Sequence, residues 1–257
     1  MNDTILVVGD KFAAFADGAA AVTVRQLAAW PGSRLQQARR IVVGQGIGPT
    51  GLAAVQQAMA RCPPAQAPSL DEHVSRRAAP GLVHKCCAQN VMITQPAPAG
   101  PDSFAAQLVL DDACAELADH TTGIHVQGMV LVEAARQMFI AVSAQICALA
   151  GFDNDRSQHL LRDVRASFRR FVYPLPTGLR LSIESTRHIA RTPLLLSAVT
   201  VRFEQDGEEG ATVHCKAVSH ERAALARSER AEADRHLSRW LHAGAATQTD
   251  RAGQHPA

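Results

Sequence analysis

The sequence predicts an α+β fold in which an antiparallel β-sheet wraps around one long central helix. Three observations lead to this prediction. A helical pattern of about 23 residues covers Gly128–Ala150. Two strand candidates precede this pattern, and four long alternating apolar segments follow it with short turns between them. Successive strands joined by short turns pair in antiparallel order, so the four segments are expected to form a meander beside the helix.

The composition supports a folded chain with a buried core. The 257 residues are 47% hydrophobic and 19% charged, which excludes disorder throughout the chain. Only 8 Phe, 2 Trp and 1 Tyr are present, so most apolar side chains are small and suit close helix packing. The net charge is +2 and the basic residues are scattered, which argues against a nucleic-acid partner.

Residues 1–65 predict a small β/α unit. Thr4–Val8 and Arg40–Val43 are strand candidates, and Gly51–Cys62 is an Ala-rich helix candidate that a Pro-Pro pair ends. Residues 66–81 are polar and contain proline, and we interpret them as a linker.

Residues 82–220 contain the predicted central helix and its sheet. The helix is long enough to cross a membrane, but Glu133 and Arg136 interrupt it, so we expect a core helix and no membrane span. A curved sheet around such a helix is the hotdog arrangement. The expected strands, in chain order, are Asn90–Thr94, Phe104–Leu110, Leu160–Tyr173, Leu179–Ile189, Leu194–Glu204 and Ala211–His220.

The C-terminal part predicts a helix and a tail. Residues 221–243 form a charged, Ala-rich helix candidate whose sparse apolar face carries Leu225, Leu237 and Trp240. Residues 244–257 are polar and contain glycine and proline, which predicts a disordered tail.

The cysteines and the N-terminus bear on the cellular compartment. None of the 6 cysteines stands in CxxC or CxH spacing, so the sequence predicts no metal site. The first residues lack a basic segment followed by an apolar run, so we expect no secretory signal. Both observations favour a reduced, cytoplasmic protein.

A glycine run follows the second strand candidate. Gly46, Gly48 and Gly51 match the GxGxxG pattern of dinucleotide-binding loops. No third strand is expected after it, and no acidic residue stands at a strand end. We therefore interpret the run as a tight turn and expect no cofactor.

The start of the central helix holds the candidate chemistry. His120 and His125 precede the helix, and Glu133, Arg136 and Gln137 lie on one face of it at spacings of i, i+3 and i+4. Burying a lone carboxylate or guanidinium costs several kcal/mol unless the group is paired or reaches a wet site. The pattern therefore fits either an ion pair at the helix surface or a functional site.

The segment His125–Gln137, HVQGMVLVEAARQ, resembles the signature of the A-factor biosynthesis hotdog family, the γ-butyrolactone synthases. The similarity also includes Val83–Lys85, Asn90–Thr94 and Phe168–Val172, so it spans the predicted hotdog domain.

The chain departs from the family pattern at three points. Gln127 replaces the usual proline, and Ile124 stands where an aspartate is frequent. One hotdog repeat is present instead of two, and the N-terminal β/α unit takes the place of the other.

The resemblance implies transfer of a β-ketoacyl group from an acyl carrier protein or acyl-CoA thioester to a small hydroxylated or phosphorylated acceptor such as dihydroxyacetone phosphate. Glu133 is then the general base, with a pKa raised by burial, and Arg136 orients it or binds a phosphate or carboxylate. The backbone amides near Gly128 and Met129 polarise the thioester carbonyl. The other candidate residues are His120 and His125 for catalysis and Gln137 and Arg170 for substrate binding.

Two other functions stay open. Hotdog dehydratases resemble this chain in having a glycine five residues before a helix carboxylate, as Gly128 and Glu133 are here, and His120 is then a dehydratase-like base. Thioester hydrolysis belongs to the same alternative. The third possibility is a non-catalytic hotdog module that binds an acyl or lactone ligand. Because a single hotdog exposes a sheet edge and half of a substrate tunnel, we expect a homodimer.

Overall fold

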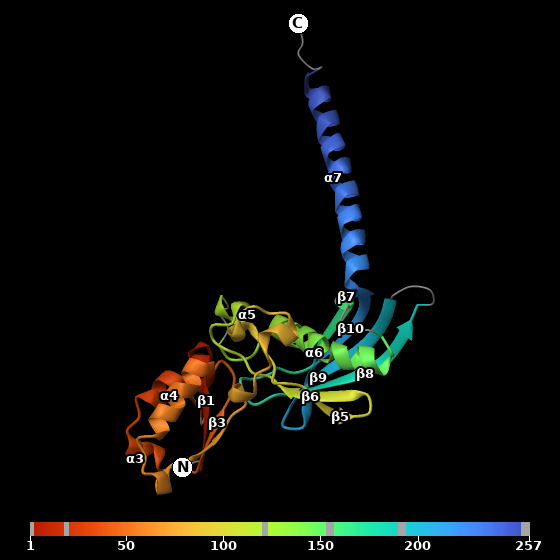
Figure 1. Ribbon diagram of the computed structural model, residues 1–257. Helices are drawn as coiled ribbons and strands as arrows, with labels where there is room; N and C mark the ends of the chain where they lie inside the picture. Colours follow the sequence, from red (N-terminus) through yellow and green to blue (C-terminus); the bar gives the residue numbers. More distant parts are fainter. Residues whose placement is uncertain (1–2, 18–20, 120–122, 153–156, 190–193, 253–257) are drawn as a thin grey trace.

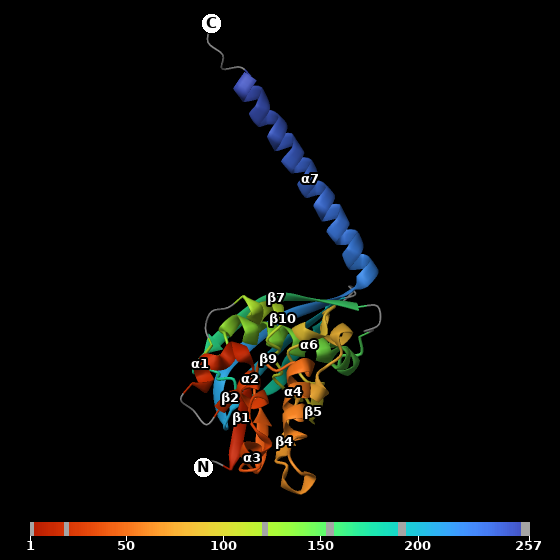
Figure 2. The same cartoon turned by 90° about the vertical axis from the view of Figure 1, so that its left-hand side faces the viewer.

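Two β-sheets and one projecting helix organise the chain (Figure 1). The computed structural model describes residues 3–17, 21–119, 123–152, 157–189 and 194–252, with side chains through residue 242. Figure 2 shows the small N-terminal sheet beside the larger sheet, with the C-terminal helix pointing away from both.

The N-terminal unit is a four-stranded parallel sheet in the order β2-β1-β3-β4. Val7 and Ile41 of this sheet pack with Leu27 and Val55 of the adjacent helices in a separate buried core. The strands are β1 (Thr4–Val8), β2 (Ala21–Thr23), β3 (Arg40–Val43) and β4 (Ser69–Asp71). The helices are α1 (Ala13–Ala16), α2 (Val24–Ala28), α3 (Gly32–Leu35) and α4 (Pro49–Met59), with 3-10 turns η1 (Asp10–Phe12), η2 (Pro64–Gln66) and η3 (Val74–Arg76).

The predicted linker at residues 66–81 is part of this folded unit. Its first segment contains β4, which pairs in parallel with β3. Val74 and Ala78 of the same stretch are buried. The prolines that suggested a linker flank a strand of only three residues, which is too short to show a hydrophobic period. The expectation of two strands and no further strand after the glycine run was therefore wrong.

The larger sheet is antiparallel, and its strand order is β5-β6-β8-β9-β10-β7. The long helix α6 (Gly128–Leu149) lies across the concave face of this sheet (Figure 1), which is the predicted hotdog arrangement. The strands are β5 (Ala97–Gly100), β6 (Ser103–Gln107), β7 (Ser157–Phe168), β8 (Gly178–His188), β9 (Leu194–Gln205) and β10 (Glu208–Glu221). The remaining short elements are η4 (Pro80–Val83), η5 (Ala88–Asn90) and α5 (Ala115–Ala118).

The first predicted strand of the hotdog, Asn90–Thr94, is not a strand. The 3-10 turn η5 ends at Asn90, and Ile93 and Thr94 each form only an isolated bridge. The edge strand β5 was not expected because its sequence, Ala-Pro-Ala-Gly, contains no β-branched or aromatic side chain.

Helix α6 is the centre of the hydrophobic core. Val130, Met138 and Phe139 are at most 1% exposed and pack in one cluster with Val201 and Val213 of the sheet. By length and composition this helix could cross a membrane, but 72% of the apolar window is buried inside the fold. Its continuous apolar character therefore reflects a helix that is covered on most sides.

The C-terminal helix α7 (Arg222–Ala252) leaves the body of the protein at the end of β10 (Figure 1). Its first turn is anchored through the buried side chain of Leu225, whereas Leu237 and Trp240 are exposed. The helix continues through Ala252 and so enters the stretch 244–257 that we expected to be disordered. The last five residues of that stretch lie outside the described part of the chain.

Candidate functional site

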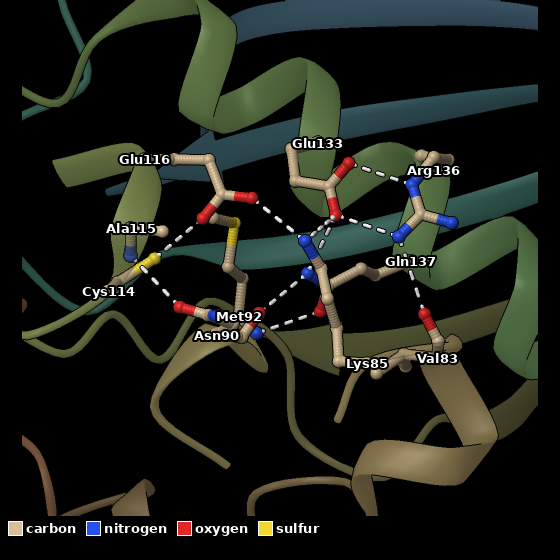
Figure 3. A network of polar contacts seen from close by, with 10 residues as sticks. All are labelled: Val83, Lys85, Asn90, Met92, Cys114, Ala115, Glu116, Glu133, Arg136 and Gln137. Atoms are coloured by element: carbon tan, nitrogen blue, oxygen red, sulfur yellow. Dashed lines mark hydrogen bonds and ion pairs between the residues drawn. The ribbon is translucent and has the colours of Figure 1, made fainter. Parts of the chain in front are cut away.

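Glu133 and Arg136 form a bidentate ion pair on α6 (Figure 3). The Arg136 Nε donates to Glu133 Oε2 at 2.7 Å, and the Arg136 Nη2 donates to Glu133 Oε1 at 2.8 Å. Their i, i+3 spacing places both groups on one stripe of the helix. The side chains are 18% and 27% exposed, so the pair is largely withdrawn from water.

Two further donors reach the same carboxylate. Gln137 donates from Nε2 to Glu133 Oε1 at 3.0 Å, and the Lys85 Nζ approaches the same oxygen at 2.9 Å. Gln137 is fully buried and is fixed from both sides, because it also donates to the Asn90 carbonyl and accepts from the Met92 amide, each at 2.8 Å. Glu133, Arg136 and Gln137 therefore contact one another, as their helical spacing predicts, but the side chain of Gln137 is buried inside the protein.

Lys85 extends the cluster beyond α6. Its ammonium group lies 2.8 Å from Glu116 Oε1, so it bridges Glu116 and Glu133. The carbonyl of Pro80 accepts from the Lys85 amide at 2.9 Å after a turn in which His84 has a φ of 55°. This left-handed turn reverses the chain after η4 and brings the lysine side chain to the helix.

Glu116 belongs to α5 and has a thiol neighbour. Cys114 donates from Sγ to Glu116 Oε2 at 3.1 Å. The amide of Ala115 donates to the Asn90 side chain at 2.9 Å, which ties α5 to the segment that also holds Gln137. The cluster thus contains two carboxylates, two cations and one thiol from three separate stretches of the chain (Figure 3).

Contacts outweigh burial in setting the charge of Glu133. Burial alone would raise the pKa of its carboxyl group, but hydrogen bonds from Arg136, Gln137 and Lys85 lower the pKa from 4.5 to about 2. The expected raised pKa of Glu133 is therefore wrong for the structure as it stands, and its role as a general base stays a prediction. The pKa of Glu133 is low because three hydrogen-bond donors and two positive charges stabilise its ionised carboxylate.

The neighbouring groups are fixed in complementary states. Burial favours a neutral Lys85, yet its contacts with Glu116 and Glu133 raise its pKa and keep it protonated. Burial, followed by the contact with Glu116, raises the pKa of the Cys114 thiol to about 12, so this sulfur is a proton donor and not a nucleophile. The cluster is an ion network that is neutral overall.

Arg136 retains donors that the network does not use. Its Nη2 also donates to the Val83 carbonyl at 3.3 Å, which fixes the plane of the guanidinium group. No oxygen among the described residues is hydrogen bonded to its Nη1. A fixed guanidinium group with outward N–H donors is suited to bind a phosphate or carboxylate.

The other predicted site residues gather in a second place, at the start of α6. His125, Gly128, Met129 and Arg170 line an open pocket of about 670 Å³ together with Phe168 and other apolar residues. Among the described residues, none of these side chains forms a hydrogen bond or ion pair with Glu133. Met129 precedes Glu133 by four residues, so both lie on one stripe of the helix and connect the two places.

The predicted site residues of this second group each have different contacts in the structure. A side chain added at Gly128 would lie 2.8 Å from the ring of Phe168, so the glycine permits a close ring contact at the helix start. The rings of His125 and Phe171 are 4.7 Å apart. Arg170 pairs with Glu208 at 3.1 Å, and both side chains are 62% exposed. His120 lies outside the described residues.

Sequence reasoning missed Lys85 and Glu116 as members of the site. A usable signal existed for the lysine, because the chain has 23 Arg and only 3 Lys, and one of these stands within the segment that resembles the family. Glu116 gave no comparable signal, since it lies in a polar stretch with several acidic residues. Among the described residues, no group of three or more His, Cys, Asp or Glu side chains could hold a metal ion.

Comparison with known proteins agrees with this fold. The A-factor biosynthesis hotdog domain matches residues 66–221, which is more than half of the chain. The protein therefore belongs to the A-factor biosynthesis hotdog family, and membership identifies it as a hotdog protein that acts on acyl thioesters. The match begins at Gln66, just before β4, and includes Lys85, Glu116, Glu133 and Arg136. It leaves out most of the N-terminal unit and all of α7.

Solved structures give a distant likeness only. A mutant thioesterase from Pseudomonas aeruginosa is 14% identical, with 50% of this chain and 81% of that chain covered and a TM-score of 0.37. A thioesterase from Haemophilus influenzae is 15% identical, with coverage of 51% and 79% and a TM-score of 0.33. The fold assignment rests on the strand order and the family match. None of the curated proteins matches the chain.

Proposed function

We propose that this protein transfers a β-ketoacyl group from a carrier thioester to the hydroxyl group of a small anionic acceptor. The observation that carries the proposal is the bidentate Glu133–Arg136 pair on the central helix, with the Arg136 Nη1 directed away from its partners. Dihydroxyacetone phosphate, which the family resemblance implies, has both the hydroxyl and the anionic group that such a site requires.

The two places along α6 have complementary chemistry in this proposal. The pocket at the helix start is mostly apolar and large enough for an acyl chain, and the backbone amides there would polarise a thioester carbonyl. Glu133 lies five residues further, a rise of about 7.5 Å along the helix. The acceptor hydroxyl would lie between these two places, with its anionic group at Arg136.

The reaction forms an ester and releases a thiol. The acceptor oxygen attacks the thioester carbonyl, and the tetrahedral intermediate collapses with cleavage of the carbon–sulfur bond. The hydroxyl proton moves to Glu133 and then to the departing sulfur. An anion bound to Arg136 competes with Glu133 for the guanidinium group, so acceptor binding raises the pKa of Glu133 from its low value and makes it a better base.

An intact-mass assay tests the proposal. The protein is incubated with a β-ketoacyl carrier protein, with and without dihydroxyacetone phosphate, and the carrier and the small products are weighed. We expect deacylation that depends on the acceptor and a new acyl ester. Loss of the acyl group as free acid, at a rate that does not depend on the acceptor, would identify a thioesterase and refute the transfer reaction. Loss of water from a 3-hydroxyacyl carrier would identify a dehydratase.

Matched variants connect the activity to the ion pair. Glu133→Gln and Arg136→Ala are expected to lower turnover by about a hundredfold or more, the typical contribution of general acid–base catalysis and of one lost charged contact. Arg239→Ala is the control, because this arginine is exposed on α7 and does not line the pocket. Unchanged turnover in both of the first two variants would place the chemistry elsewhere.

We also propose a homodimer that pairs the β7 edges of two copies. β7 is the last strand of the sheet order, and its Val164 and Phe168 are 40% and 51% exposed. Met129 on α6 is 73% exposed beside the same edge. Light scattering at micromolar concentration tests this, and a monomer would contradict it. The proposed compartment is the reduced cytoplasm, consistent with the thiol state of Cys62, Cys114 and Cys215.

A further inference from the structure

The N-terminal unit has no function in the proposed reaction, yet it touches the element that carries Glu116. The glycine run 44–51 follows β3 directly, at the carboxyl-end edge of the parallel sheet. Open α/β sheets usually bind ligands at this edge. In this protein, segments of the hotdog domain occupy that edge.

Two carboxylates fill the space that the glycines leave. A side chain at Gly48 would lie 1.9 Å from the Asp111 Oδ2, and one at Gly46 would lie 2.4 Å from the Asp112 Oδ1. Gly46 also has a φ of +83°, which a glycine adopts without strain. The adjacent pocket is lined by Asp10, Asp111 and Asp112, whose negative charges would repel a phosphate. The glycine run therefore receives part of the same chain, in agreement with a tight turn.

Gln45 joins the N-terminal unit to the hotdog domain through hydrogen bonds. It is 2% exposed, its Nε2 donates to the carbonyls of Leu108 and Leu175 at 3.0 and 3.1 Å, and its Oε1 accepts from the Leu110 amide at 3.0 Å. Its backbone amide also donates to the Pro174 carbonyl at 3.0 Å. One buried side chain thus satisfies three backbone groups of the hotdog domain, which fixes the chain that leads into α5.

Lys11 holds the two ends of α5. Its backbone amide donates to the Asp112 Oδ2 at 3.1 Å before the helix, and its Nζ donates to the carbonyl of Ala118, the last helix residue, at 2.5 Å. α5 has only four residues, so it depends on contacts with its surroundings for its position. Glu116 projects from it to Lys85, and Lys85 reaches Glu133.

We infer that the N-terminal unit is an internal positioning platform, in which Lys11 and Gln45 hold α5 so that Glu116 orients Lys85 against Glu133. Lys11 and Gln45 are positioning residues and touch neither substrate nor Glu133. The effect on turnover rests on the proposed function, whereas the effect on α5 does not.

Labelling of Cys114 tests the position of α5 without any activity. Cys114 is fully buried and becomes accessible to a maleimide only when the α5 segment opens. Peptide mass mapping separates it from the exposed Cys86 and Cys87. We expect Lys11→Met to increase its labelling rate by about tenfold, the effect of losing one charged hydrogen bond. Lys216→Met is the control, because this lysine is exposed on β10. Among the described residues, its side chain forms no hydrogen bond or ion pair with α5 or with the N-terminal unit.

A double-mutant cycle tests whether Lys11 acts through Glu116. Independent sites combine multiplicatively within about twofold. We expect Lys11→Met to lower kcat about fivefold in the natural chain, with little change in KM for the acceptor, and less than twofold in the Glu116→Gln background. Gln45→Glu, which loses both donated hydrogen bonds, should behave like Lys11→Met.

The outcomes separate the two proposals. Wild-type labelling of Cys114 in Lys11→Met and Gln45→Glu would overturn the platform, even if acyl transfer is observed. Equal loss of turnover in both backgrounds of the cycle would also overturn it. Faster labelling in a protein without transfer activity would refute the proposed reaction and leave the coupling of Lys11 to α5 intact.

Discussion

The charge state of Glu133 can be measured through the pH dependence of stability. Its pKa of about 2, compared with 4.5 for an ordinary glutamate, corresponds to about 3 kcal/mol of stabilisation at neutral pH, at 1.36 kcal/mol for each tenfold change in proton affinity. Because the folded pKa is the lower one, this contribution is complete above about pH 5 and is lost as the pH falls towards 2. About 2 kcal/mol of it disappears between pH 7 and pH 3.

Glu133→Gln removes the contribution of this carboxyl group to the pH dependence of stability and changes the shape of the side chain little. The free energy of unfolding is measured by urea titration at pH 7, 5, 4 and 3, with far-UV circular dichroism as the signal. We expect the variant to be less stable at pH 7 and the gap to the natural protein to narrow by about 2 kcal/mol at pH 3. Glu229→Gln, on the exposed surface of α7, should show a constant gap. A constant gap for Glu133→Gln would refute the reasoning, because it would mean that the network does not hold this carboxylate ionised.

Three further predictions concern the packing around the site. Burial raises the pKa of Asp112 from 3.8 to about 6, so Asp112→Asn should stabilise the protein by up to about 3 kcal/mol at pH 8, and the gain should vanish near pH 4 in the same urea assay. Gln137→Met leaves the Met92 amide and the Asn90 carbonyl without their buried partner, so calorimetry should show a loss of about 2–4 kcal/mol. Gly48→Ala forces a side chain against Asp111 and should cost about 1–3 kcal/mol, whereas Gly81→Ala meets open space and should leave the melting temperature unchanged.

The architecture was predictable where long periodic segments specify it. Gly128–Leu149 repeats apolar residues over six turns, and the four strands after it alternate between short turns. Short segments carry too little pattern to be assigned. β4 has three residues, and β5 is formed by small residues at a sheet edge. Conversely, the apolar run Val91–Ile93 is buried without being a strand, because Gln137 binds the Met92 amide in place of a neighbouring strand.

The site was predictable to the extent that it lies on one helix. Glu133, Arg136 and Gln137 are neighbours at helical spacing, so their contact follows from the pattern alone. Lys85 joins them after a left-handed turn at His84, and Glu116 joins them from α5, which contacts Lys11 of the N-terminal unit. The pKa of Glu133 is lowered by hydrogen bonds from Arg136 and Gln137 on the same helix and from Lys85, so burial alone predicted the wrong direction.

The ion network itself argues for a functional role. Partly buried ion pairs gain little stability over apolar side chains of similar size, because desolvation offsets the attraction between the charges. The core of this protein is otherwise filled by small and aliphatic residues, and Glu133 and Arg136 stand on the same helix as that core. A purely structural helix would therefore be served equally well by leucine or methionine at these positions. The charged pair adds a guanidinium group with a fixed plane and outward donors. Together with Glu116 and Lys85, the pair forms a cluster that is neutral overall. In the proposed reaction, binding of the anionic acceptor would change the partner of Arg136 and the basicity of Glu133 in one step, which would couple recognition of the acceptor to its activation.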